Sequence, residues 1–162
     1  MSEDLAYLGG LIDGEGYIGI NKAKKVASFW GWHFHPSVKV AAVDRRMPEF
    51  FLERWGGRID LRRFKEELNH RDAWCWMITT SKLVEPFIDE ILPYLRLKKE
   101  QAEIVKAFCQ RPYGKKGNTG RRSSSDGPVA GTMSKEEFDL REVLYWRIRA
   151  LNRVGRPPAQ TE

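Results

Sequence analysis

Leu8-Gly9-Gly10-Leu11-Ile12-Asp13-Gly14-Glu15-Gly16 is the stretch that decides the fold of this chain. Apolar residues at the 3, 4 spacing of one helix face predict a helix over residues 3–13, which Gly14 and Gly16 end. Ala6, Gly10 and Gly14 lie four residues apart and form a stripe of small residues. Each glycine inside a helix costs about 1 kcal/mol relative to alanine, and close packing of another helix backbone would compensate. The stripe therefore predicts a helix–helix contact.

Two acids, Asp13 and Glu15, fall at the C-terminal end of this helix, where the helix dipole disfavours negative charge. A bound cation would reverse that penalty, and the flanking glycines would let backbone carbonyls approach the ion that Glu15 holds. The alternative is a tight helix-to-strand turn with two solvated acids. Both interpretations stay open on these residues alone.

The rest of the chain alternates between period-2 and helical patterns. Residues 17–26 and 33–43 predict one hairpin, and residues 58–62 and 71–79 predict a second. Helices are predicted over residues 48–55, 80–92, 97–110 and 134–152, the last with a Ser134/Glu137 capping box. The fold class is α+β, with one four-stranded antiparallel sheet and helices on its apolar face. We expect a single domain over residues 1–154, with a core at 3–110, a basic mobile loop at 111–131 and a frayed tail at 155–162.

Composition narrows the function classes. A chain of 162 residues suits one domain, and its net charge of +6 favours a polyanionic partner. The two cysteines show no CxxC or zinc spacing, which argues against a disulfide framework or structural zinc. Without a signal-peptide pattern or an apolar run near ~20 residues, we expect a soluble intracellular protein with no membrane partner and no small-molecule substrate.

The nine-residue stretch closely resembles the motif that names the LAGLIDADG homing endonucleases. It differs by Gly9 and Gly14 in place of alanines and by Glu15 in place of the second aspartate. The order of elements over about residues 4–110 is similar to that family's αββαββα core. The motif occurs once, so the chain resembles the homodimeric branch. The resemblance implies an intracellular, site-specific double-strand DNA endonuclease, from a prokaryotic cytoplasm or an organelle, that cuts a long pseudo-palindromic site.

The resemblance also implies the site residues. Glu15 would ligate the metal with the carbonyl of Gly14 beside it. Lys98 would project into the active site, with Lys99 as the fallback and a solvated lysine as the alternative. Asp44 would position water, or else cap the next helix. The metal would be Mg²⁺, with Mn²⁺ as a substitute and Ca²⁺ supporting binding without cleavage. The dimer interface would contain four residues of the first helix: Ala6, Gly9, Gly10 and Asp13. For Asp13, a hydrogen-bond acceptor at the helix end is the favoured alternative.

The polar sides of the two hairpins predict the DNA-binding surface. They carry five Lys or Arg against one acid, and Arg and Asn can make paired contacts to base edges in the major groove. His33 and His35 lack a third metal ligand, so base or phosphate contact is favoured over metal binding. The predicted DNA-binding residues are Asn21, Lys25, His33, His35, Ser37, Lys39, Arg45, Arg58, Asp60, Arg62, Arg71, Lys115, Lys116, Arg121 and Arg122.

Two other functions fit the sequence. One is a non-cleaving LAGLIDADG-type RNA maturase or DNA-binding protein. The other is an unrelated basic α+β domain in which the glycine-rich turn is accidental. Retained Glu15 and Lys98 weigh against the first, and the order of the elements weighs against the second.

Overall fold

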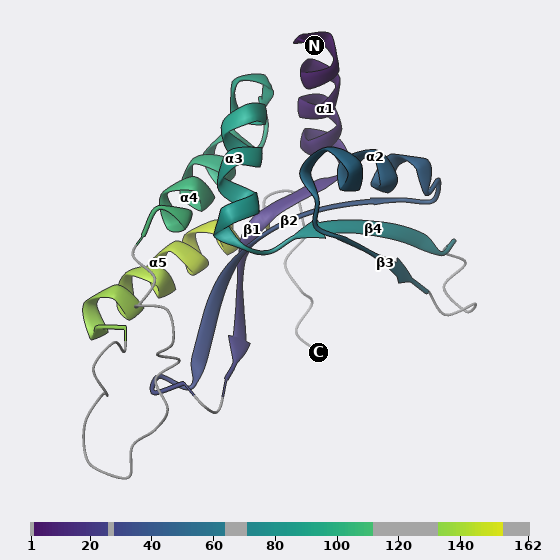
Figure 1. The fold of residues 1–162 in the computed structure, drawn as a ribbon. Coiled ribbons are helices and arrows are strands. Elements are labelled where there is room, and N and C mark those ends of the chain that lie inside the picture. The colour runs from purple at the N-terminus through teal and green to yellow at the C-terminus, as the bar shows by residue number, and fades with distance from the viewer. Residues whose placement is uncertain (1, 26–27, 64–70, 112–132, 154–162) are drawn as a thin grey trace, which may run out of the picture.

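The computed structural model describes residues 2–25, 28–63, 71–111 and 133–153 (Figure 1). The elements, in chain order, are α1 (Ser2–Glu15), β1 (Gly16–Lys24), β2 (Trp32–Ala42), α2 (Arg46–Trp55), β3 (Arg58–Arg62), β4 (Ala73–Ile78), α3 (Ser81–Ile91), the short 3-10 helix η2 (Leu92–Tyr94), α4 (Lys99–Cys109) and α5 (Lys135–Leu151). The predicted basic loop, apart from residue 111, and the predicted tail lie outside the described residues.

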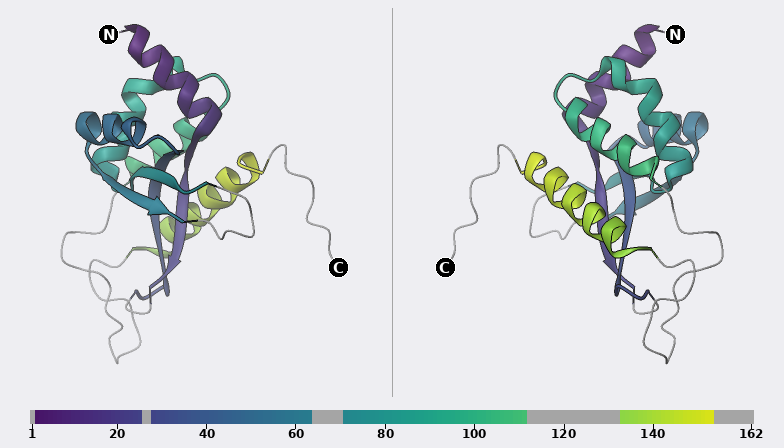
Figure 2. Two further views of the ribbon diagram at one scale, coloured as in Figure 1. Left: turned by 90° about the vertical axis from the view of Figure 1, so that its right-hand side faces the viewer. Right: turned by 90° about the vertical axis from the view of Figure 1, so that its left-hand side faces the viewer.

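The four strands form one antiparallel sheet in the order β1-β2-β4-β3. Strand residues alternate between faces. In β1, Ile18 and Ile20 are buried on one side, and in β2 and β4 Val38 pairs with Ile78 and Val40 with Trp76 on that same side. Helices α1 to α4 lie over this apolar side, while the sheet curves away beneath them (Figures 1 and 2). The predicted α+β class and four-stranded sheet are confirmed.

Aromatic side chains fill the space between the sheet and α2 and α3. The Trp76 ring lies 4.8 Å from that of Phe51 and 5.4 Å from that of Phe87, centroid to centroid. Its indole N–H donates to the carbonyl of Gly56 at 2.7 Å, so the buried polar atom is satisfied. No helix in the described part of the chain is both long and apolar enough to cross a bilayer.

Helix α1 is longer than the sequence predicted. Gly14 does not end it, and the helix continues to Glu15, directly before β1. The consequence is that both acids of the motif belong to the last turn of a helix rather than to a loop.

Helix α5 carries a buried charge whose carboxylate partner also binds Arg111, just after α4. Ser134 caps the helix by accepting from the amide of Glu137 at 3.2 Å, which confirms that part of the predicted capping box. The guanidinium of Arg141 is fully buried and donates to the Glu137 carboxylate at 2.7 Å. Arg111 binds the same carboxylate at 2.8 Å. Burial alone would raise the pKa of Glu137, but its bonds to Arg111 and Arg141 outweigh this and lower the pKa.

Helix α5 therefore contains two i,i+4 ion pairs that differ in burial. The Arg141–Glu137 pair is buried, and the Lys135–Asp139 pair is exposed. Glu137→Gln removes the carboxylate charge that the buried Arg141 guanidinium binds and is expected to lower the free energy of unfolding by about 3 kcal/mol. Asp139→Asn is expected to change it by less than about 1 kcal/mol. Urea denaturation at pH 7 measures both. Equal losses in the two variants would contradict the role given to Glu137.

Candidate active site and nucleic-acid interface

The carboxylate of Asp13 caps the start of α4. One oxygen accepts from the amides of Arg96 at 2.7 Å and Leu97 at 3.1 Å, and the other accepts from the amide of Lys98 at 2.9 Å. Burial alone would raise the pKa of Asp13, but these three N–H groups and the Lys98 charge outweigh it, so the pKa is lowered. The carboxylate therefore stays ionised and ties α1 to the chain segment that enters α4.

The side chain of Lys98 makes the reverse connection. Its ammonium donates to the carbonyls of Ile12 at 2.8 Å and Asp13 at 2.6 Å, which belong to the last turn of α1. These carbonyls lie where a helix leaves acceptors unpaired and where its dipole favours a cation. Partial burial lowers the pKa of Lys98, while the charges of Asp13 and Glu15 act in the opposite direction. Lys98 thus lies beside the acidic end of the motif.

Glu15 lies exposed at the end of α1, over the polar face of the sheet. It lines a hollow of about 260 Å³ with six residues of β1, β2, β3 and β4: Tyr17, Asn21, Lys39, Ala41, Arg62 and Cys75. The sheet register explains this set, because Lys39, Ala41 and Cys75 point to the face opposite the core. The charges of Lys39 and Arg62 suit this face to an anion, and the Glu15 carboxylate stands at its edge.

The donor set around Glu15 fits part of a hard-cation site. Carboxylate and backbone carbonyl oxygens, such as those of Glu15 and Gly14, are the ligands that Mg²⁺ prefers. Within the described ranges, no three or more His, Cys, Asp or Glu side chains gather at one point. The described residues therefore hold only part of such a ligand set around Glu15.

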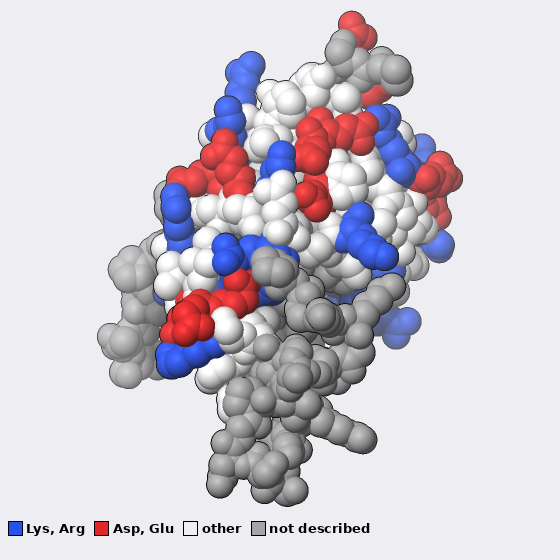
Figure 3. Space-filling model, turned by 60° about the vertical axis from the view of Figure 1, so that its left-hand side comes forward, with Lys and Arg blue, Asp and Glu red and all other residues white. Residues whose placement is uncertain are grey.

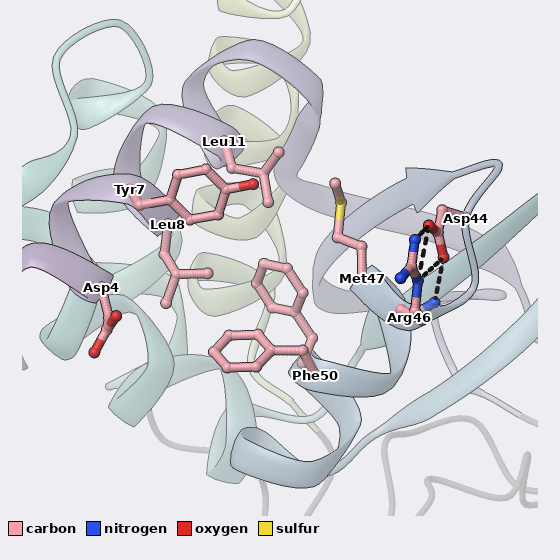
Figure 4. Close-up of a pocket in the computed structure, with 9 residues that line it drawn as sticks. Asp4, Tyr7, Leu8, Leu11, Asp44, Arg46, Met47 and Phe50 are labelled. Atoms are coloured by element: carbon pink, nitrogen blue, oxygen red, sulfur yellow. Dashed lines mark hydrogen bonds and ion pairs between the residues drawn. The ribbon is translucent and has the colours of Figure 1, made fainter.

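Asp44 lies in a different hollow, of about 500 Å³, between α1 and α2 (Figure 4). It accepts from the amide of Arg46 at 2.9 Å and forms an ion pair with the Arg46 guanidinium, whose hydrogen bonds hold the pKa of Asp44 at about 2. Arg45, not Asp44, is the cap residue of α2. The structure thus does not bring Asp44 into the hollow that Glu15 lines.

The predicted stripe of small residues is exposed, but Gly9, which was also predicted at the dimer interface, is buried. Ala6, Gly10 and Gly14 lie on the surface of α1, and a Cβ added at Gly10 or Gly14 would meet nothing within 4 Å. Gly9 is different, because a Cβ there would lie 2.7 Å from the carbonyl oxygen of Tyr94 in the same chain. The prediction of Gly9 as an interface residue is wrong, since it packs against η2.

Asp13 was also predicted at the dimer interface. Its carboxylate is instead occupied within the chain, at the start of α4. This agrees with a helix-end acceptor role rather than with contact to a second copy.

Most predicted DNA-binding residues on the strands share the polar face. Arg58, Asp60 and Arg62 are exposed on β3, and Asn21, His33, His35 and Lys39 are partly buried on β1 and β2. Lys25 follows β1 close enough to His33 to influence its charge, and Arg71 is exposed before β4.

Two predicted DNA contacts do not fit. Ser37 is fully buried, although it lies in β2 opposite Gly19 on the same face as Lys39. Arg45 stacks 4.6 Å from the ring centre of Trp74, which points to the helix-covered side of the sheet. Lys115, Lys116, Arg121 and Arg122 lie outside the described residues.

The sequence also missed several residues of the site. Tyr17 and Cys75 line the hollow beside Glu15, and the backbone amides that hold Asp13 have no signature in side-chain chemistry. On the side of the molecule formed by α3, α4 and α5, acidic and basic side chains are interspersed (Figure 3). That side therefore lacks the cationic bias of the sheet's polar face.

The motif helix, the curved sheet and the covering helices together give the chain the fold of the LAGLIDADG homing endonucleases, as the sequence predicted. Similar solved structures include the homing endonuclease I-CvuI bound to the I-CreI target with Mg, its DNA not cleaved, at a TM-score of 0.70 and 14% identity over 99% of this chain and 87% of that one. The archaeal intron-encoded homing endonuclease I-Vdi141I, bound to DNA, matches at a TM-score of 0.57 and 17% identity over 67% of each chain.

A third similar structure is the group I intron-encoded homing endonuclease I-CeuI bound to DNA. Its TM-score is 0.55, at 22% identity over 68% of this chain and 55% of that one. No protein-family model matches the sequence, and a search of curated protein sequences finds no similar one. The relationship is therefore visible in the fold rather than in overall sequence identity.

The Asp13 cap gives a prediction on stability. Asp13→Asn removes the charge that three amides bind and is expected to lower the free energy of unfolding at pH 7 by about 1–3 kcal/mol. A lowered pKa means that the wild-type advantage is present above pH 3.8 and is lost as the pH falls through the folded-state value. Urea denaturation between pH 7 and pH 3 measures this.

The control for that experiment is Asp89→Asn. Asp89 pairs with Lys106 on the surface, so its loss is expected to cost less than about 1 kcal/mol. An Asp13→Asn protein as stable as the control at pH 7 would show that the cap contributes nothing.

Proposed function

We propose that this protein is a LAGLIDADG-type DNA endonuclease that acts as a homodimer on both strands of a specific duplex site. The observation that carries the proposal is the position of Glu15. Its carboxylate stands at the end of α1, open to the polar face of the sheet, and the ammonium of Lys98 binds the same helix end. The Glu15 carboxylate, which would bind the metal, thus lies near the Lys98 ammonium and the basic face of the sheet. A scissile phosphate could lie among them.

The chemistry assigns a role to each group. Glu15, with the carbonyl of Gly14, would hold Mg²⁺. When bound, the metal polarises the phosphate and lowers the pKa of the attacking water. Lys98 would place positive charge next to the phosphate as negative charge develops on it in the transition state. Phosphate oxygens of the DNA and a carboxylate from the second copy would complete the ligand set that one chain lacks.

The exposed face of α1 supports the homodimer. The stripe of Ala6, Gly10 and Gly14 would let a second α1 approach closely, which would offset the helix cost of its glycines. Next to the stripe, Tyr7 is 67% exposed and Phe50 of α2 is 43% exposed. Both line the apolar hollow between α1 and α2, as Figure 4 shows. Large exposed apolar side chains of this kind are typical of interaction sites.

A two-fold dimer explains how both strands could be cut. Each copy would bring one Glu15 to the axis, one for each strand. The nine residues of β1 span roughly 30 Å at ~3.3 Å per residue, which is about nine base pairs. Two copies would therefore cover about 18 base pairs of a pseudo-palindromic site, with Lys39, Arg58 and Arg62 among the DNA contacts.

The catalytic assignment is tested by Glu15→Gln. This variant should fold and bind duplex DNA as the wild type does, yet lose cleavage by at least about 100-fold, because the amide is a poor ligand for the metal. The measurement is cleavage in Mg²⁺ of a duplex library randomised over its central base pairs, with binding measured in Ca²⁺. Glu3→Gln, at the opposite end of α1, is the matched control and should cut normally.

Three outcomes contradict this proposal. Full cleavage by Glu15→Gln would remove Glu15 from the active site. Binding without cleavage by the wild type itself would instead indicate a DNA-binding protein, and binding of RNA alone would indicate a maturase.

The dimer is tested separately at Gly10. Gly10→Leu should fold, because the position is open in the single chain, but the added side chain would separate the two α1 helices. We expect the wild type to sediment as a dimer at micromolar concentration and the variant as a monomer without cleavage activity. Ala107→Leu, at an exposed small residue of α4, is the control and should stay dimeric. A Gly10→Leu protein that remains a fully active dimer would place the interface elsewhere.

A further inference from the structure

Asn21 and His35 face each other across the β1–β2 hairpin on the polar side of the sheet. The amide nitrogen of Asn21 lies 3.3 Å from Nε2 of His35. An amide nitrogen can only donate, so Nε2 must be an acceptor without a proton. The imidazole is therefore neutral in this arrangement and carries its proton on Nδ1.

This contact fixes which way the Asn21 amide points. One N–H is used by His35, and the carbonyl oxygen with the second N–H remains available toward the hollow that Asn21 lines. An acceptor and a donor side by side match the N6 and N7 positions of adenine in the major groove. Were His35 to gain a proton, both facing atoms would be donors. The amide would then have to turn over and would present its acceptor and donor in the opposite order.

From this geometry we propose that Asn21 and His35 form one specificity-determining unit, in which neutral His35 orients Asn21 to read adenine and protonated His35 abolishes that preference. The inference rests on the proposed DNA-binding function. Asn21 lies five residues beyond Gly16, at roughly 17 Å along the strand. The base it reads should therefore lie about five base pairs from the phosphate that faces Glu15.

The surroundings of the histidine pair keep it neutral at pH 7. Half-burial lowers the pKa of His35, and Lys39 on the same strand lowers it further. Burial likewise lowers the pKa of His33, with added effects from His35, from Lys25 after β1 and from Arg141 of α5. The two rings stack at 5.6 Å between centroids. Since the ordinary pKa of histidine is 6.5 and the pKa of His35 is lowered, His35 in the free protein becomes protonated below pH 6.5.

The test compares DNA selection at pH 7.5 and pH 5.5. Duplexes randomised over 24 or so central base pairs are selected for binding in Ca²⁺, and affinities are then measured for singly substituted duplexes. The wild type should prefer adenine at one position in each half-site by at least about tenfold at pH 7.5. At pH 5.5, or at the lower pH where nitrogen NMR first shows His35 protonated, this preference should fall below about threefold, while other positions keep theirs.

Three variants isolate the unit. Asn21→Ala should lose the preference at both pH values, whereas His35→Gln, which cannot titrate, should show the same preference at both. His33→Gln leaves the Asn21 contact in place and should keep the pH dependence. In the free protein at pH 7.5, nitrogen NMR of the imidazole should show the Nδ1–H tautomer of His35, which needs neither DNA nor a variant.

The outcomes separate the two proposals. Selective binding with no change in adenine preference between the two pH values, or an Nε2–H tautomer of His35, overturns this inference and leaves the endonuclease proposal standing. Failure to enrich any duplex at either pH overturns both.

Discussion

The exchange of hydrogen bonds between the end of α1 and the start of α4 is the interaction on which the rest of the site depends. Asp13 of α1 accepts from three backbone amides before α4, and Lys98 before α4 donates to two carbonyls of α1. Lys98 satisfies carbonyls that the end of α1 leaves unpaired, and Asp13 satisfies backbone amides of the segment that leads into α4. Because both connections meet at Asp13, two residues before Glu15, they fix where that carboxylate stands.

The sheet adds a polar surface next to this junction. Its alternation of faces sends Val40 and Trp76 into the core under the helices and Lys39 and Cys75 to the other side. The helix layer thus holds the sheet by burial, while the polar face stays open beside Glu15. Buried packing, rather than the polar residues themselves, therefore provides the rigidity that recognition of a duplex would need.

Sequence patterns predicted those features that depend on neighbours along the chain. Periodicity located the helices and strands, the motif located Glu15, and a second resemblance over residues 93–102 placed Lys98 in the same site. The patterns failed where packing within the folded chain decides the outcome. Gly9 was predicted at an interface but packs on Tyr94, 85 positions away, and Ser37 was predicted on DNA but is covered. Neither contact leaves a mark in local residue spacing, and the same holds for the backbone amides that Asp13 binds.

Amide hydrogen exchange before α4 tests the junction most directly. Arg96 and Leu97 are exposed residues outside regular helix, so their amides would exchange at nearly the rate of an unfolded chain if nothing bound them. The hydrogen bonds to Asp13 predict slow exchange at both amides and at Lys98, approaching that of the α4 interior. Exchange at the unprotected rate at these three positions would contradict the account of how Glu15 is placed.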